Sequence, residues 1–319
     1  MKPSPQVVST APASQPGIPT PTLQNVHYGE HERQVLDFWK APGTAPTPVV
    51  FYIHGGGWLG GDKSRIELPG GGAGIEKLRA AGISVVSISY RYVVQTPVTE
   101  LQPRVKLPLD DAARGLQFVR SKAAEWKIDP ERIGVTGGSA GACSALWLTF
   151  HRDLADPKSS DPVARMSSRP WCAAVMEAQT SLDPLELKEW TPNSRYGGHA
   201  FGFAWDPKNW DAEFADFYAH RAQVLPWIQE YSPYALATPD APPVYLFYGH
   251  DVPALGQEKK DPTHTANQGA KLKEKLDRIG VTCELVYPGA PQVQHADVIA
   301  YFIDILKAPR APKAPVTAR

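Results

Sequence analysis

Ser139 lies at the centre of the segment Gly137-Gly138-Ser139-Ala140-Gly141, which fits the pattern G-x-S-x-G. The apolar run RIGVT precedes this segment, and the apolar helical pattern AGACSALWLTF follows the serine. A serine between a strand and a helix stands on a sharp turn that raises its hydroxyl above the sheet. The helix N-terminus behind it also favours negative charge that develops nearby. The motif and its context therefore predict that Ser139 is a nucleophile.

A second glycine-rich segment, His54-Gly55-Gly56-Gly57-Trp58, follows the apolar run VVFYI. Attack on a carbonyl carbon places negative charge on the carbonyl oxygen, and losing one backbone N–H donor to that oxygen costs about 3 kcal/mol. Glycines let the backbone approach the oxygen without an intervening side chain. We predict that the N–H groups of Gly56, Gly57 and Ala140 form an oxyanion hole. Trp58, and Trp205 further along the chain, are expected to contact the substrate.

A serine hydroxyl attacks efficiently only when a base accepts its proton, so a histidine is required. His295 lies in YPGAPQVQHAD, between the last predicted strand and the last predicted helix, where a loop can reach the carboxyl edge of the sheet. Its position also gives the chain order serine, acid, histidine that accompanies such a serine turn. We predict His295 as the base. Other histidines come too early, or fall in a helix, the inserted segment or the glycine motif: His27, His31, His151, His199, His220 and His54.

The acid that orients the histidine should lie between the strand VYLFYGH and the helix AKLKEKL. Asp251 directly follows the strand, which places it close to the sheet. Asp261 lies in Lys260-Asp261-Pro262-Thr263-His264, one short turn before the helix, in a loop that Pro262 stiffens. We predict Asp261 on loop geometry, with Asp251 as the alternative and Glu258 a distant third.

The composition limits the kinds of partner and cofactor that the chain could bind. The 319 residues include 33 Lys and Arg against 33 Asp and Glu, a balance that offers no basic field to nucleic acid or an anionic membrane. Three cysteines, Cys143, Cys172 and Cys283, are scattered without metal-ligand spacing, and no apolar run is long enough to span a bilayer. We therefore expect no metal, no organic cofactor and no membrane span.

The elements that must position these residues alternate between strands and helices. Buried apolar runs such as VVFYI, ISVVSISYR and AAVMEAQ are separated by helical patterns at 74–81, 109–126 and 140–150. The runs LQNVHY and QVLDFW suggest a hairpin ahead of them. This order predicts an α/β fold with a mostly parallel central sheet flanked by helices. The aromatic-rich interval 183–243 breaks the rhythm, and we interpret it as a cap over the site.

The two ends of the chain differ from the part between them. Residues 1–22 and 308–319 are rich in proline, which predicts tails on either side of a single domain over 23–307. The first residues lack the apolar stretch of a secretory signal, so the sequence as written carries no export address. A natural signal replaced by Met1 would look the same, and the compartment stays open.

The segments HGGGW, SYRY at 89–92, LPLDDAARGLQFVR and IDPERIGVTGGSAGA together resemble the esterase/lipase branch of the α/β-hydrolase fold. The resemblance covers 23–306 and is nearest to the hormone-sensitive-lipase-like and the feruloyl or carbohydrate esterase-like groups. It implies the oxyanion hole assigned above and hydrolysis of a small-molecule carboxylic ester through an acyl-enzyme on Ser139. Amide, formamide or peptide hydrolysis at the same site is the alternative, and a non-catalytic ligand sensor is less favoured. The chain departs from the family pattern after Gly249, where the loop is longer than usual.

Overall fold

The computed structural model describes residues 17–93, 101–204, 206 and 208–309. Its central sheet has the strand order β1-β2-β4-β3-β5-β6-β7-β8, and every neighbouring pair from β4 to β8 is parallel. The hairpin β1–β2 adds an antiparallel edge, as the sequence predicted. The strands are β1 Leu23–His27, β2 Val35–Trp39, β3 Thr47–Ile53, β4 Ser84–Ile88, β5 Ile128–Gly137, β6 Cys172–Met176, β7 Val244–Phe247 and β8 Cys283–Val286.

The central strands are buried on both faces, which explains why their sequences are continuously apolar rather than alternating. Along β3, Val50 and Tyr52 face one hydrophobic cluster, while Phe51 and Ile53 face another. This separation follows from the two-residue period of a strand.

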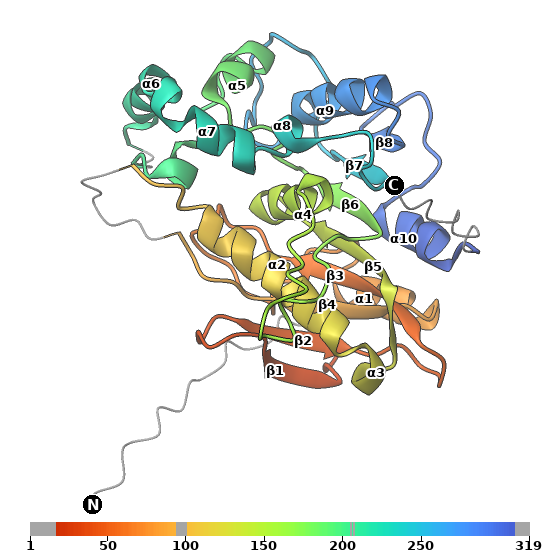
Figure 1. The fold of residues 1–319 in the computed structure, drawn as a ribbon. Coiled ribbons are helices and arrows are strands. Elements are labelled where there is room, and N and C mark those ends of the chain that lie inside the picture. The colour runs from red at the N-terminus through yellow and green to blue at the C-terminus, as the bar shows by residue number, and fades with distance from the viewer. Residues whose placement is uncertain (1–16, 94–100, 205, 207, 310–319) are drawn as a thin grey trace, which may run out of the picture.

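Helices cover both faces of the sheet (Figure 1). Helices α1 (Gly72–Ala80) and α10 (Val298–Lys307) pack on the face of Val50, whereas α2 (Lys106–Ser121), α4 (Ala140–Phe150) and α9 (Ala266–Arg278) pack on the face of Phe51. The short helix α3 (Ala123–Trp126) follows α2 after a break at Lys122, so the single helix predicted over 109–126 is two.

The interval between β6 and β7 folds as a helical insertion above the sheet in Figure 1. It contains α5 (Pro184–Trp190), the 3-10 helix η1 (Gly198–Phe201), α6 (Trp210–Ala219), α7 (Arg221–Tyr231) and α8 (Pro233–Leu236). Most of its described aromatic side chains are buried and form part of the hydrophobic core, among them Tyr196, Phe201, Phe203, Phe214 and Phe217. These aromatics therefore anchor the insertion. Its role as a cap over the site stays a prediction.

The predicted N-terminal tail lies mostly outside the described residues, but its last part is ordered. Ile18 packs against the core beside α1, and the Trp39 indole donates a hydrogen bond of 2.7 Å to the carbonyl of Pro19. Part of the predicted tail, at residues 17–22, therefore contacts the domain through the partly buried Ile18 and the Pro19 carbonyl. Within the described ranges, no helix is both long and apolar enough to cross a membrane.

Candidate active site

Ser139 stands on a strained turn between β5 and α4, as the motif predicted. Its backbone has φ 53° and ψ −125°, a conformation that is uncommon for a residue with a side chain. The Ser139 N–H donates to the carbonyl of Met176 at the end of β6. A Cβ on Gly141 would lie 2.1 Å from the carbonyl oxygen of Ile53, which explains why the turn requires glycine there. The turn thus fixes the Ser139 hydroxyl at the carboxyl ends of the strands.

His264 is the imidazole that reaches Ser139. Its Nε2 lies 2.9 Å from the Ser139 Oγ, and its Nδ1 lies 2.8 Å from Oδ2 of Asp261. An ionised carboxylate can only accept, so Nδ1 carries the hydrogen of the neutral ring and Nε2 is left to accept from the serine hydroxyl. The three side chains form a serine–histidine–carboxylate relay with the geometry of a catalytic triad.

Asp261 is held by its own loop. Its Oδ1 accepts hydrogen bonds from the backbone N–H groups of Thr263 (3.1 Å) and His264 (3.2 Å). Partial burial raises the pKa of the Asp261 carboxyl, but the hydrogen bond and positive charge of His264 and these N–H groups outweigh it, so the pKa lies below its usual value. Asp261 is therefore charged at neutral pH and faces the nitrogen that must stay protonated.

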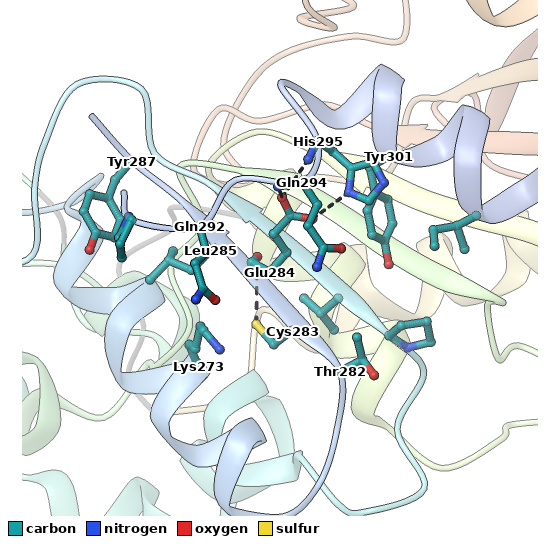
Figure 2. Close-up of a pocket in the computed structure, with 14 residues that line it drawn as sticks. Lys273, Thr282, Cys283, Glu284, Leu285, Tyr287, Gln292, Gln294, His295 and Tyr301 are labelled. Carbon is teal, nitrogen blue, oxygen red and sulfur yellow. Dashed lines mark hydrogen bonds and ion pairs between the residues drawn. The ribbon is translucent and has the colours of Figure 1, made fainter. Parts of the chain in front are cut away.

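The structure does not bring His295 to Ser139, and the placement predicted for it is wrong. Its Nδ1 lies 2.6 Å from Oε2 of Glu284 on β8, and its Nε2 lies 3.2 Å from Oδ2 of Asp304 on α10. Figure 2 shows His295 beside Glu284 and Tyr301 at the rim of a cavity of about 290 Å³ along the outer strand of the sheet. Two carboxylates hold the ring at this edge, so it cannot serve the serine.

His295 serves instead to fasten the loop between β8 and α10. Glu284 also accepts from the backbone N–H of His295 at 2.8 Å. Burial lowers the pKa of His295, but hydrogen bonds and charge from Glu284 and Asp304 outweigh it and raise the pKa above its ordinary value. Both ring nitrogens face acceptors, an arrangement that only the imidazolium form satisfies fully.

The prediction of His295 rested on chain order and loop position alone. Order and loop position favoured His295, whereas the segment Asp261-Pro262-Thr263-His264 contains an acid and a histidine three residues apart in one loop. A carboxylate that accepts the N–H groups two and three residues ahead forms a tight turn, which brings the imidazole at the fourth position back to the carboxylate. That spacing was the signal by which His264 could have been found.

The alternative acid, Asp251, anchors the start of α9 and does not contact His264. It accepts from Nζ of Lys259 (2.8 Å), Oγ1 of Thr265 (2.6 Å) and the backbone N–H of Ala266 (3.3 Å). These contacts close the long loop after β7 and fix the position from which His264 projects. Asp251 is thus a structural residue of the loop that carries Asp261.

The glycine loop predicted as the oxyanion hole lies directly against the serine turn. A Cβ on Gly55 would lie 2.8 Å from the carbonyl oxygen of Gly138 and 3.4 Å from the Ser139 Cβ. Gly56 and Gly57 have φ values of 102° and 61°, in the region that favours glycine. The loop backbone therefore approaches Ser139 closely, as the predicted oxyanion hole requires.

Trp58, predicted to contact the substrate, packs inside the protein, and its role toward a substrate stays a prediction. The side chain is fully buried, its Nε1 donates to Oγ of Ser144 at 2.9 Å, and its ring packs near Tyr196 and His199. Its hydrogen bond to Ser144 anchors the glycine loop to α4. Trp205, the second predicted contact, lies outside the described residues. Within the ranges that the structure describes, no group of three or more His, Cys, Asp or Glu side chains is arranged to hold a metal ion.

Fold and site together define an α/β-hydrolase. The chain belongs to the BD-FAE family, whose family model matches residues 36–276. It is 32% identical over 139 residues to a probable isoprenylcysteine alpha-carbonyl methylesterase of Oryza sativa subsp. japonica, covering 43% of this chain and 30% of that relative. It is also 28% identical over 252 residues to carboxylesterase NlhH of Mycobacterium tuberculosis, covering 78% of this chain and 66% of the relative. The chain thus spans less than a third of the length of the first curated relatives that it matches.

Solved structures share the fold at low sequence identity. A truncated carbohydrate esterase from gut microbiota superposes with a TM-score of 0.61 at 17% identity, over 91% of this chain and 98% of the other. Thermogutta terrifontis esterase 2 phosphonylated by sarin gives a TM-score of 0.58 at 20% identity, over 86% of each chain. The resemblance to the esterase/lipase branch of the α/β-hydrolase fold is confirmed.

Proposed function

We propose that the protein is a serine hydrolase of carboxylic esters, with Ser139 as nucleophile, His264 as general base and Asp261 as the residue that orients the imidazole. The observation that carries the proposal is the contact of 2.9 Å between His264 Nε2 and Ser139 Oγ, with Nδ1 of the same ring held by Asp261. The membership of the BD-FAE family and the similarity to carboxylesterase NlhH support an ester as the substrate.

Acylation begins when the Ser139 oxygen attacks the carbonyl carbon of the ester and its proton passes to His264 Nε2. The carbonyl oxygen becomes an oxyanion, for which the N–H groups of Gly56, Gly57 and Ala140 are the proposed donors. The imidazolium then gives its proton to the departing alcohol oxygen as the bond between carbonyl carbon and that oxygen breaks. Asp261 stays ionised throughout and faces the charged ring.

Deacylation repeats the same steps with water. His264 accepts a proton from the water as its oxygen attacks the acyl carbon, and the oxyanion forms at the same donors. Collapse of this intermediate breaks the bond to Ser139 Oγ, which recovers its proton from Nε2. The products are a carboxylic acid and the free enzyme, and no redox step or cofactor is required by this chemistry.

The direct test is covalent labelling of the nucleophile. A fluorophosphonate should react with Ser139 in the wild-type protein, and peptide mass spectrometry should find one adduct on that residue. Ser139→Ala should give no adduct and no turnover of p-nitrophenyl acetate. Ser144, which is buried in α4 five residues after Ser139, is the internal control and should stay unlabelled. Full turnover by purified Ser139→Ala would overturn the proposal.

The same site could in principle cleave an amide. Comparing turnover of p-nitrophenyl acetate with that of an aryl formamide and a dipeptide anilide separates these reactions. We expect the ester to be cleaved fastest, because an alcohol leaves more readily than an amine and the named relatives are esterases. A preference for the formamide or the anilide would assign the site to amide hydrolysis instead.

A further inference from the structure

A second carboxyl group lies beside the relay and has no role in the mechanism above. Glu177 follows β6 directly, one residue after the Met176 carbonyl that holds the backbone of Ser139. Its backbone has φ 52°, an uncommon value for a residue other than glycine. Strained residues of this kind cluster at functional sites, because the surrounding structure must hold them in place.

The Glu177 carboxyl is fixed by one oxygen only. Its Oε1 accepts from the backbone N–H of Gly249 at 2.7 Å, and its own N–H donates to the carbonyl of Phe247 at 2.8 Å. Its Oε2 is shielded from solvent and has no hydrogen-bond partner among the residues that the structure describes. A buried carboxylate oxygen without a partner is costly, so its presence beside the site calls for an explanation.

Gln179 ties the backbone of Glu177 to the loop that carries His264. The Gln179 side chain is buried, and its Nε2 donates to the carbonyl of Glu177 at 3.2 Å and to that of Thr263 at 3.1 Å. Thr263 immediately precedes His264. One side chain therefore fixes the distance between the end of β6 and the residue before the imidazole.

The pKa of the Glu177 carboxyl depends on the charges of both His264 and Asp261. Burial is the largest influence, and it raises the pKa of the Glu177 carboxyl above its ordinary value. The Gly249 N–H and the charges of His250 and His264 lower the pKa in part. The negative charge of Asp261 raises it again. The titratable groups whose charges act on Glu177 or respond to it include Asp261, His250, His264 and the phenol of Tyr248, which follows β7.

Asp261, the carboxylate that contacts the His264 imidazole, is poorly shielded from water. The Asp261 side chain is 61% exposed and that of His264 is 35% exposed, so water screens the attraction between them. A charge that is held in a less polar environment acts more strongly at the same distance. A negative charge that is better shielded than Asp261 would therefore add to the stability of the imidazolium formed during acyl transfer.

We propose that Glu177 is a positioning residue of the active site, whose shielded carboxylate stabilises the imidazolium form of His264 together with Asp261. The proposal rests on the proposed function, because it assigns the purpose of the Glu177 charge to proton transfer at Ser139. Glu177 itself donates or accepts no proton in the reaction.

The test uses Glu177→Gln, which keeps an acceptor for the Gly249 N–H and removes the charge. The pH profile of kcat/KM should show its acid limb moved to lower pH by about one unit, because loss of a nearby negative charge makes the imidazolium less stable. At pH 8, kcat should fall by about tenfold with little change in KM. Glu177→Asp keeps the charge and should leave the acid limb near its wild-type position.

Controls separate this effect from loss of folding or of general charge. Fluorophosphonate titration of Ser139 counts the active sites in each variant, and rates are expressed per labelled site. Glu258→Gln removes an exposed carboxylate from the long loop between β7 and α9, and it should leave the pH profile of kcat/KM unchanged. An unshifted acid limb with wild-type kcat in Glu177→Gln, or a change in KM alone, would overturn the proposal while leaving Ser139 hydrolysis intact. A wild-type protein that neither reacts with fluorophosphonate nor cleaves esters would overturn the proposed function, and this inference with it.

Discussion

The Nε2 atom of His264 lies 2.9 Å from the Oγ atom of Ser139, although 125 positions of the chain separate the two residues. The serine is placed by the turn between β5 and α4, and the histidine by the long loop between β7 and α9. Both loops leave the carboxyl ends of parallel strands, which is where α/β folds assemble their sites.

Replacing His264 and His295 separately by alanine distinguishes their roles. We expect His264→Ala to lower kcat for p-nitrophenyl acetate by at least about a thousandfold, because the proton of Ser139 then has no acceptor. His295→Ala should keep kcat within a few-fold of the wild-type value and lower the melting temperature instead. Steady-state kinetics and thermal unfolding of both variants check this. An inactive but stable His295→Ala would contradict the assignment.

Substitutions of Asp261 and Asp251, the two aspartates of the long loop between β7 and α9, should have different effects. Asp261→Asn removes the charge that faces Nδ1 and should reduce kcat by about a hundredfold, less than the roughly 10⁴-fold seen where a triad carboxylate is buried. Asp251→Asn should act mainly on stability, because its contacts to Lys259 and Thr265 hold the loop rather than the ring. The measurement is kcat per fluorophosphonate-reactive site. Equal losses of kcat in both variants would count against the distinction.

The glycine loop offers a matched pair of substitutions. A Cβ on Gly56 would lie 2.4 Å from the carbonyl oxygen of Gly60, at a φ of 102°, so Gly56→Ala must displace the loop. We expect kcat to fall by at least about tenfold, as for loss of part of an oxyanion hole. A Cβ on Gly60 meets no atom within 4 Å, and Gly60→Ala should therefore retain activity. Comparable kcat in the two variants would show that the Gly56 backbone has no part in the reaction.

The His295 contacts make one part of the stability depend on pH. The folded-state pKa of His295 lies above its ordinary value near 6.5, so the folded state binds the proton more tightly than the unfolded chain. Its contribution is full below about pH 6.5 and is lost as the pH rises through the folded-state pKa. His295→Gln should thus lower the melting temperature more at pH 5.5 than at pH 9. A larger loss of melting temperature at pH 9 than at pH 5.5 would contradict a stabilising role for the charged His295 between Glu284 and Asp304.

Local sequence was sufficient to predict the fold and the turn that carries Ser139. The alternation of apolar strands and helical patterns predicted the mostly parallel sheet, and the apolar hairpin runs predicted its antiparallel edge. The turn at Ser139 was predictable because a strand, a glycine-flanked serine and a helix are consecutive in the chain. The glycines that allow β5 and α4 to approach lie within the same motif.

Which residues contact Ser139 depends on the paths of long loops, and the pattern of apolar and polar residues in the sequence did not reveal those paths. His295 and His264 both follow strands and both could reach the sheet edge, so chain order favoured His295. The structure turns His295 outward, because Glu284 and Asp304 together neutralise its ring at the edge of β8. It turns His264 inward, because Asp261 accepts the N–H groups of its own loop and Gln179 fastens that loop to β6.

The sequence by itself determined the class of fold, the serine turn and the glycine loop beside it, since each depends on residues that are neighbours in the chain. Only the tertiary structure decided which histidine meets the serine and which carboxylates meet that histidine. The physical reason is that hydrogen bonds and ion pairs between distant segments, including those of Gln179, Glu284 and Asp304, fix the loop paths.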